Sequence, residues 1–282
     1  MLMQAFIDKQ IAPTEGACPL LDTGIVLFAN RIEKTYANGT RALDEISLSI
    51  RHGDFISLLG PSGCGKSTLV RMFAGLEQAS HGHVRWLSAD APDKCGMKIA
   101  MVFQDATLMP WATVAVNVRL PLDLAGMPRS QANQRVESAL EQVGLADFGK
   151  VYPRELSGGM KMRVSIARAL VIEPDVLLMD EPFGALDEFS RNKLDADLRA
   201  LWAERGLTVV FVTHSIYESV FLSSRVVVMA ARPGRIVADV AIDEPVRDES
   251  FRLSPQFAEH CRHLSDTLIS VSAHMLTTHS RD

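Results

Sequence analysis

The sequence contains few cysteines, no long apolar run and no block of positive charge. Its four cysteines, Cys18, Cys64, Cys95 and Cys261, are scattered over 282 residues. A disulfide at Cys64 would distort the glycine-rich stretch around it, so we expect reduced thiols and a cytoplasmic protein. The net charge is -5 without a long Lys/Arg block. The electrostatic footprint of a nucleic-acid binder is therefore missing, and no nucleic-acid partner is expected.

Membrane and secretion signals are also missing. No window approaches the roughly 20 apolar residues that a membrane helix needs, so we expect a chain that does not span a membrane by itself. The start, MLMQAFIDKQIAPTEG, lacks a basic segment followed by an apolar run, which argues against a signal peptide. A composition of 47% hydrophobic and 22% charged residues is typical of a soluble globular protein. The length fits one domain with lobes or two small domains.

Hydrophobic periodicity divides the rest of the chain into strands and helices. Residues 1–23 show little pattern and predict a flexible extension. The first strand is expected over 24–36, an alternating antiparallel strand over 46–51 and a buried one over 55–60. The stretch from about 105 to 160 is expected to be helical, with Ser130 as the N-cap of a helix over 130–143. Buried parallel strands follow in DVLLMD and LTVVFVTHS, then two strands around Pro233-Gly234, and a last helix from Ser254-Pro255.

A phosphate-binding loop is predicted between the strand at 55–60 and the helical pattern STLVRMFAG. It matches G-x-x-x-x-G-K-[ST] and consists of Gly60, Pro61, Ser62, Gly63, Cys64, Gly65, Lys66, Ser67 and Thr68. In this context loop amides and a helix N-terminus cradle phosphate, Lys66 reaches the β and γ phosphates of ATP, and Ser67 binds Mg²⁺. A plain glycine-rich turn is the alternative, which the strand, loop and helix order disfavours.

Three polar residues follow buried strands. Asp180 ends VLLMD and is suited to Mg²⁺, while the adjacent Glu181 can take a proton from an attacking water. His214 ends another buried strand and is expected to contact the γ-phosphate, with a core histidine as the alternative. An acidic strand end alone could be a solvated edge. Downstream of a phosphate loop, a catalytic role is the better interpretation.

The motif order resembles the nucleotide-binding subunit of an ATP-binding cassette (ABC) transporter. The motifs after the loop are FQD at 103–105, LSGGM at 156–160, DEPF at 180–183, GALD at 184–187 and VTHS at 212–215. The resemblance implies a P-loop NTPase core with a mostly parallel α/β sheet, an antiparallel β lobe and a helical lobe. It also implies an ATPase domain over 24–245 and a helical tail over 246–282. Within it, Tyr36 would stack on adenine, Gln104 would link the metal and water to the transporter interface, and Asp187 would bridge two protomers.

The same resemblance implies a role for the turn formed by Ser157, Gly158 and Gly159. Two cassettes would associate head to tail, so that this turn and its helix N-terminus cap the γ-phosphate bound by the other copy. A simple glycine-rich helix start is the alternative. The commonest form of the motif has Gln where this chain has Met160, and Met162 stands where Gln is also frequent.

LSGGM, FQDATLMPWATVAVNV and ARPGRI are similar to the importer group for nitrate, sulfonates, taurine and related solutes. The resemblance implies permease subunits as partners, indirectly a solute-binding protein, and a peripheral place on the cytoplasmic face of the inner membrane. The alternative is a cassette ATPase of DNA repair or translation, which would carry an inserted coiled coil or a second cassette. A regulatory binder without turnover would be expected to lack Glu181 or His214. A metal site at HCRH, residues 260–263, is disfavoured because only His260 and His263 could pair on one helical face.

Overall fold

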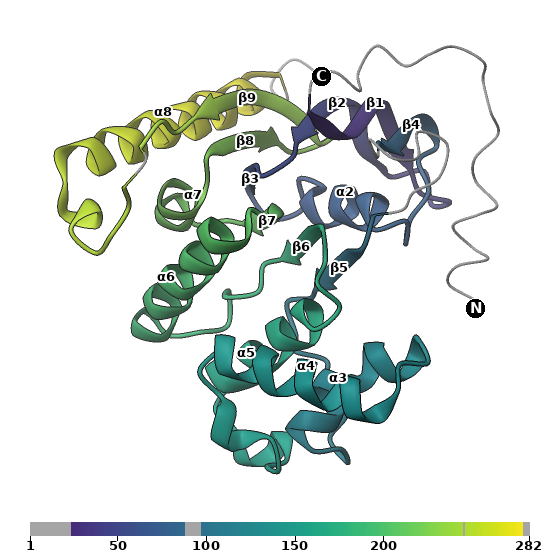
Figure 1. Cartoon of the computed structure of the whole chain (residues 1–282). Helices are drawn as coiled ribbons and strands as arrows, with labels where there is room; N and C mark the ends of the chain where they lie inside the picture. The colour runs from purple at the N-terminus through teal and green to yellow at the C-terminus, as the bar shows by residue number, and fades with distance from the viewer. Residues whose placement is uncertain (1–23, 88–96, 245, 279–282) are drawn as a thin grey trace. The chain divides into compact units, whose positions relative to one another are not determined.

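The computed structural model describes residues 24–87, 97–244 and 246–278 (Figure 1). These residues divide into two compact units. The first unit holds the described residues up to Met97 and from His214 onward, and the second holds Lys98–Thr213. The predicted extension over 1–23 lies outside the described residues. Among the described residues, no helix is both long and apolar enough to cross a bilayer.

An antiparallel sheet in the first unit has the strand order β2-β1-β4. Its strands are β1 (Ile25–Thr35), β2 (Arg41–Arg51) and β4 (His81–Trp86). The alternation predicted for β2 is confirmed, since Ile46, Leu48 and Ile50 are buried. Ala29 of β1 lies opposite Leu48 of β2 and Val84 of β4, so one face of the sheet contributes to the core.

The first unit also contains the strand and helix that flank the predicted phosphate loop. These elements and their neighbours are β3 (Phe55–Leu59), α2 (Lys66–Phe73), α7 (Ile216–Leu222), β8 (Arg225–Ala230) and β9 (Arg235–Ala241). Strand β3 is buried at every residue and parallel to β8, as its continuous apolar run predicts. Strands β8 and β9 form the predicted antiparallel pair around Pro233-Gly234.

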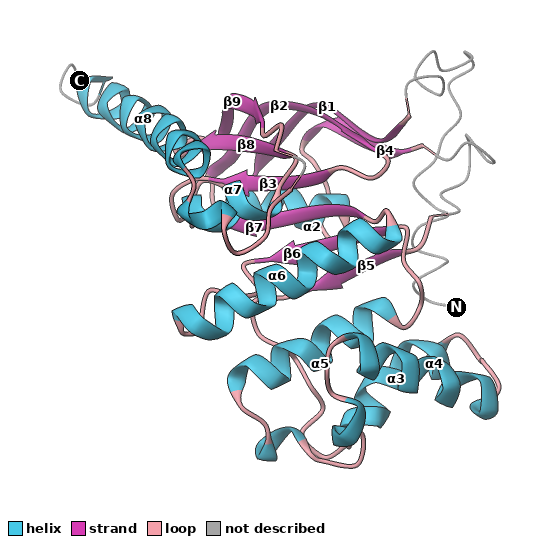
Figure 2. Cartoon of the chain, turned by 60° about the vertical axis from the view of Figure 1, so that its left-hand side comes forward, coloured by secondary structure: helices cyan, strands magenta, loops and turns pink. Residues whose placement is uncertain are grey.

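The C-terminal helix α8 (Pro255–Thr278) begins where predicted, after a short 3₁₀ turn, η4 (Phe251–Leu253). The buried Arg247 donates hydrogen bonds to the carbonyls of Val220 and Ser223 near the end of α7. The ring of Phe257 stacks on Tyr217 of α7, with 6.0 Å between the ring centroids. Figure 2 shows α7 and α8 side by side, so the tail packs against the body of its unit.

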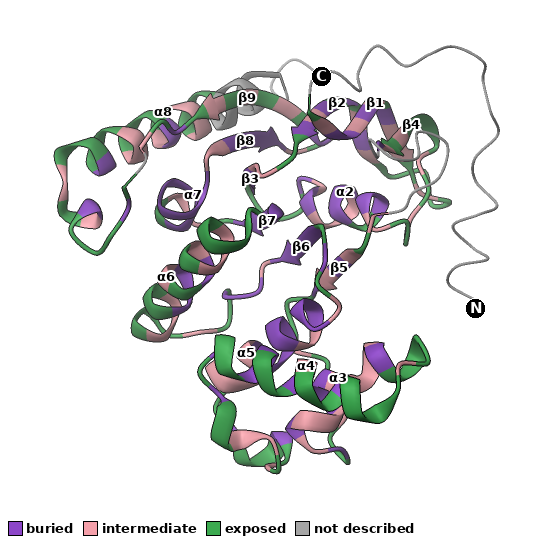
Figure 3. Cartoon of the chain, in the orientation of Figure 1, coloured by how far each residue is buried: buried purple, intermediate pink, exposed green. Residues whose placement is uncertain are grey.

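The second unit combines a parallel three-stranded arrangement with helices. Its strands are β5 (Ile99–Val102), β6 (Val176–Asp180) and β7 (Thr208–Thr213), and α6 (Glu188–Arg205) connects the last two. Strands β6 and β7 are buried at every residue, which Figure 3 shows in purple. Together with the first unit's elements, this confirms the predicted α/β fold with its mostly parallel pairing.

The remaining helices of the second unit pack together (Figure 2). They are α3 (Val114–Leu124), α4 (Arg129–Gln142) and α5 (Gly158–Leu170), with 3₁₀ turns η2 (Ala146–Phe148) and η3 (Pro153–Glu155). Helix α5 begins directly after Ser157, at the Ser-Gly-Gly turn where a helix N-terminus is expected. Ser130 is not the N-cap of α4, because the helix starts earlier and Pro128 holds that position. Proline has a preset φ and no N–H to satisfy, which favours a helix start directly after it.

Candidate nucleotide-binding and catalytic residues

The predicted phosphate loop joins β3 to α2 and requires glycine at two of its positions. Gly65 is the N-cap residue of α2 with φ of 92°, a left-handed conformation that favours glycine. A Cβ built on Gly65 would lie 2.5 Å from Leu43 Cδ2. A Cβ on Gly60 would lie 2.5 Å from the backbone oxygen of Met229. The loop backbone therefore lies close against neighbouring strands, and glycine-rich loops before a helix of this type can present their amides to an anion.

Lys66 is 4% exposed, and its ammonium lies over this loop. Its Nζ donates hydrogen bonds to the carbonyl oxygens of Gly60 at 2.8 Å and Pro61 at 3.0 Å. Burial raises the pKa of the nearby Cys64 thiol, and the charge of Lys66 partly opposes this. The loop thus presents one fixed cation and a protonated thiol, and this donor set fits a phosphate group.

Tyr36 is placed beside the start of α2. Its hydroxyl lies 3.2 Å from Thr68 Oγ1, and Lys34 Nζ lies 5.1 Å from the centroid of its ring. The structure therefore joins Tyr36 to the end of the phosphate loop, while adenine stacking stays a prediction. His214 is exposed in the same unit and immediately precedes Ser215, whose hydroxyl caps α7 by accepting from Glu218 N–H.

Gln104 and Glu181 lie around one glycine in the second unit. A Cβ on Gly184 would lie 3.9 Å from both Gln104 Nε2 and Glu181 Oε2. Asp180 is buried at the end of β6, and Glu181 follows with φ of 46°, which is sparsely populated for a side chain of this kind. The amide of Glu181 donates to Val212 O at 3.1 Å. Strained backbone of this kind concentrates at functional sites, so Glu181, with Gln104 on the other side of Gly184, marks a candidate catalytic centre.

The Ser-Gly-Gly turn begins α5 and lies beside the start of α6. The Ser157 hydroxyl caps α5 by accepting from Met160 N–H at 3.3 Å, and Asp187 caps α6 by accepting from Ser190 N–H at 2.9 Å. These hydrogen bonds from Ser190 hold the pKa of Asp187 below its usual value. Leu186 Cδ2 would lie 3.6 Å from a Cβ on Gly158, so the two helix starts are neighbours.

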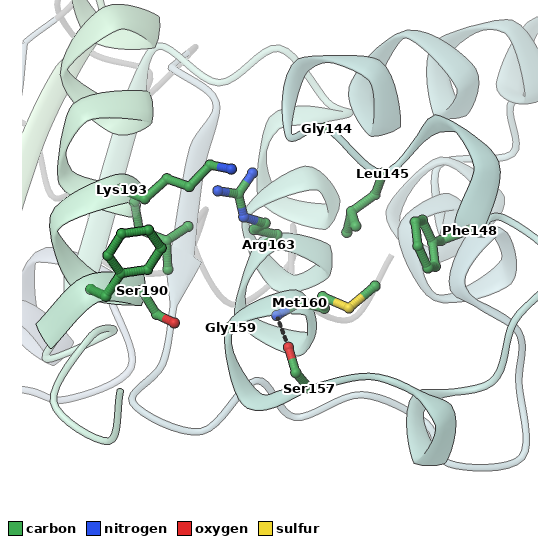
Figure 4. Close-up of a pocket in the computed structure, with 11 residues that line it drawn as sticks. Gly144, Leu145, Phe148, Ser157, Gly159, Met160, Arg163, Ser190 and Lys193 are labelled. Atoms are coloured by element: carbon green, nitrogen blue, oxygen red, sulfur yellow. Dashed lines mark hydrogen bonds between the residues drawn. The ribbon is translucent and has the colours of Figure 1, made fainter. Parts of the chain in front are cut away.

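A pocket of about 280 Å³ opens between these two helix N-termini (Figure 4). Ser157, Ser190 and Lys193 line it, with Met160 and Phe148 as apolar parts of the wall. Met160 therefore lies at the pocket surface. Met162, by contrast, is buried in the core, which explains why an apolar residue stands there.

Arg191 is one residue that the motif search missed. Its Nη2 donates to Leu186 O at 2.8 Å, and its Nε donates to Phe183 O at 3.4 Å. It therefore holds the segment between Glu181 and Asp187, one helical turn from the latter residue. A cation four residues after Asp187 could have revealed it, because positions i and i+4 share a helix face.

A metal site was not expected at HCRH, and one weak contact is present there. His260 Nε2 lies 3.7 Å from Glu244 Oε1. In the parts of the chain that the structure covers, no group of three or more His, Cys, Asp or Glu side chains could hold a metal ion.

Comparisons with known proteins agree with this geometry. The family model described as "ABC transporter" matches residues 43–184. The taurine import ATP-binding protein of Rhizobium johnstonii is 43% identical over 85% of this chain and 92% of its own length. The aliphatic sulfonates import ATP-binding protein of Bacillus licheniformis is 41% identical over 80% and 87%. A putative ATP-binding protein of Brucella abortus is 46% identical over 78% and 85%.

Solved structures give the same result. A dimeric ATP-binding cassette in a post-hydrolysis state with ADP and Pi has a TM-score of 0.67 and 33% identity, covering 77% of this chain and 99% of that one. A component of an ABC transporter complex from Clostridium perfringens has a TM-score of 0.70 and 29% identity, covering 85% and 99%. On the family match, the identities and the shared fold together, the chain belongs to the ABC transporter family, as an ATP-binding subunit with ATPase activity.

Proposed function

We propose that this ATPase is the motor subunit of an importer for nitrate, a sulfonate, taurine or a related small solute. The observation that carries the proposal is the identity of 43% and 41% to taurine and aliphatic sulfonates import ATP-binding proteins, over at least four fifths of each chain. Two longer stretches of this chain, FQDATLMPWATVAVNV and ARPGRI, resemble the same group. A role in DNA repair or translation is not favoured, because the taurine and sulfonates relatives are named as import proteins.

Within this proposal each candidate residue has a separate role in binding ATP and Mg²⁺ or in hydrolysis. Bound Mg²⁺ would neutralise phosphate charge and would be held by Ser67, Gln104 and Asp180. The loop from Gly60 to Thr68 binds the phosphates, and Tyr36 packs on adenine. Glu181 accepts the proton of the attacking water, and His214 contacts the γ-phosphate. Family membership supports combining these residues, and the chemistry of each donor fits its task.

The proposed partners are a second copy of the chain and permease subunits, with a solute-binding protein reached indirectly. In the head-to-tail dimer, Ser157, Gly158 and Gly159 cap the nucleotide of the opposite copy, and Asp187 contributes to the interface. The subunit then sits peripherally on the cytoplasmic face of the inner membrane. Trp111 is 78% exposed beside Pro110, and exposed tryptophans are frequent anchors at protein interfaces.

Replacement of Glu181 by glutamine tests the ATPase assignment. Glu181→Gln should bind ATP normally and slow turnover by about 10² to 10⁴, because a general base contributes that much while the phosphate cradle is untouched. Steady-state ATP hydrolysis and bound nucleotide are measured at saturating Mg-ATP. Glu141→Gln, an exposed carboxylate on α4, is the matched control and should behave like the wild type. Near-normal turnover of Glu181→Gln would remove this residue from the role.

Gentle co-purification from membranes tests the importer assignment. The expected partners are hydrophobic permease subunits, and ATP hydrolysis of the complex should rise when the matching binding protein and solute are added. Recovery of a ribosome or DNA in their place would contradict the proposal.

A further inference from the structure

An arginine of α5 donates hydrogen bonds to the backbone of the loop that carries Gln104. Arg168 donates from Nη2 to Ala106 O at 2.8 Å and from Nη1 to Thr107 O at 2.9 Å. Nη2 also lies 2.9 Å from Thr107 Oγ1 and 3.3 Å from Ser165 Oγ. One planar guanidinium thus binds two consecutive carbonyls of the loop through separate nitrogens. The ammonium of a lysine has a single nitrogen and lacks this fixed fork of donors.

Thr107, which accepts hydrogen bonds from Arg168, has a strained backbone. Thr107 has φ of 47°, and β-branched residues are genuine outliers in this region because their Cβ crowds the backbone. Such a conformation persists only where the surroundings impose it. Three of the hydrogen bonds from Arg168 converge on Thr107 and the carbonyl before it, so they are the interactions that can impose it.

The far end of the same loop is fixed independently. Asn117 is fully buried, accepts from Met109 N–H at 2.7 Å and donates to the carbonyls of Ala112 and Thr113. The residues after Thr107 are therefore anchored by α3. Those before it, including Gln104, lie between the end of β5 and the carbonyl of Ala106, to which Arg168 donates.

We propose that Arg168 is a positioning residue for ATP hydrolysis, which holds Thr107 in its left-handed conformation and thereby keeps Gln104 beside Glu181. The proposal rests on the proposed function through the role of Gln104. Arg168 lies two residues before the end of α5, the helix that begins at Ser157, so the helix of the Ser-Gly-Gly turn also carries the clamp on the Gln104 loop. A change in the position of α5 would move both.

The test combines Arg168→Met with Thr107→Gly. Methionine keeps an unbranched apolar stem and removes every donor, so kcat should fall about tenfold to hundredfold, since small misplacements near the reacting atoms have effects of this size. The KM for Mg-ATP should stay within about twofold, because the hydrogen bonds of Arg168 go to Ala106, Thr107 and Ser165. Glycine adopts positive φ freely, so adding Thr107→Gly to Arg168→Met should raise kcat at least about threefold above the single variant.

Arg199→Ala is the matched control. Arg199 is another half-buried arginine of the second unit, on α6, and lies over the Trp202 ring at 4.5 Å. Its loss should change kcat by less than about twofold. If Arg168→Met fails to fold, Arg168→Lys replaces it, with a smaller loss of kcat that Thr107→Gly again reduces.

Three outcomes would overturn the inference: a normal kcat in the folded Arg168 variant, a loss that appears only in KM, or a loss of kcat that Thr107→Gly does not reduce. The proposed function fails separately. If the wild type hydrolyses no ATP, or Glu181→Gln turns over normally, the fault lies there, whereas normal results for both with any of the three outcomes reject only the role of Arg168.

Discussion

Two helices of this protein begin at glycine-rich turns, but for different physical reasons. At α2, in the first unit, the fold itself demands glycine. Gly65 has φ of 92°, and a Cβ there would lie 2.5 Å from Leu43 Cδ2. No side chain caps this helix start, and the buried Lys66 donates its hydrogen bonds to the carbonyls of Gly60 and Pro61.

At α5, in the second unit, the local fold demands much less. A Cβ on Gly158 would meet Leu186 Cδ2 at 3.6 Å, and one on Gly159 would meet Ser190 Cβ at 3.9 Å, both ordinary contacts. Neither glycine has positive φ, and the Ser157 hydroxyl already caps the helix. Alanine would fit both positions within the unit.

The difference indicates where the constraint on each turn comes from. The phosphate loop is explained by the strands around it. The Ser-Gly-Gly turn leaves its backbone open without local need, which is what a close approach by a group from outside the unit requires. This favours the proposed capping of a nucleotide held by a second copy.

The largest expected effect is in mixed dimers, which test whether the Ser-Gly-Gly turn acts on the nucleotide of the other copy. Pairing a Lys66→Ala chain with a Gly158→Asp chain should place both lesions in one site and leave the other intact. Lys66→Ala removes the cation for the phosphates, and Gly158→Asp brings a carboxylate towards the γ-phosphate. We expect the split pairing to retain ATP, whereas a double-mutant chain paired with a wild-type chain retains none. ATP per tagged mixed dimer is measured with Glu181→Gln present throughout to block turnover.

Retention by the double-mutant pairing alone would mean that the turn acts within its own chain. A wild-type pairing and the two uniform pairings give the upper and lower limits of bound ATP. Loss in both mixed pairings would show that the two sites close only together, and Ser157→Ala in one chain then provides a milder lesion for the same comparison.

Single alanine substitutions sharpen the contrast between the two turns. Gly65→Ala should destabilise the chain by on the order of 1–3 kcal/mol, because of the left-handed backbone and the contact with Leu43. Gly158→Ala should leave stability unchanged or raise it by at most about 1 kcal/mol, since alanine favours helix. ATP turnover should fall in both. The measurements are urea unfolding and ATPase rates, and an equal loss of stability in the two variants would refute the distinction.

Much of the fold was predictable because strong periodicity coincided with local signals. The buried runs of β3, β6 and β7 are confirmed, as is the order of strand, loop and helix at the predicted phosphate loop. The start of α4 was wrong because Ser130 is a good cap in isolation, whereas Pro128 decides the helix entry. Met162 needed the structure, since only its burial shows that it belongs to the core.

The candidate site was predictable only where a motif names the residue. Gln104, Asp180 and Glu181 follow from short motifs, but the sequence does not reveal that Gln104 and Glu181 lie around Gly184. The clamp by Arg168 joins positions 61 residues apart through side-chain to backbone contacts. Such contacts leave no periodic trace, and a strained φ at Thr107 cannot be inferred from a threonine.

The smallest expected effect concerns the two caps beside the Ser-Gly-Gly turn. Asp187 and Ser157 each cap a helix N-terminus by accepting a hydrogen bond from a backbone N–H, but only Asp187 titrates. Its pKa is lowered in the folded chain by hydrogen bonds from Ser190, so its stabilisation is present above the unfolded pKa and is lost as pH falls through the folded pKa. Asp187→Asn keeps a good cap that cannot titrate.

We therefore expect wild type and Asp187→Asn to differ by a small, constant free energy of unfolding above about pH 5, and this difference should shrink as pH falls below about 4. Ser157→Ala is the control: it should cost about 1 kcal/mol at every pH, because a hydroxyl cap carries no charge. Urea unfolding of the three proteins between about pH 3 and 7 gives the comparison, with acid effects common to all three cancelling in the differences. A difference for Asp187→Asn that stays constant down to pH 3 would show that the Asp187 cap does not titrate in this range, and the contrast between the two caps would then be one of geometry alone.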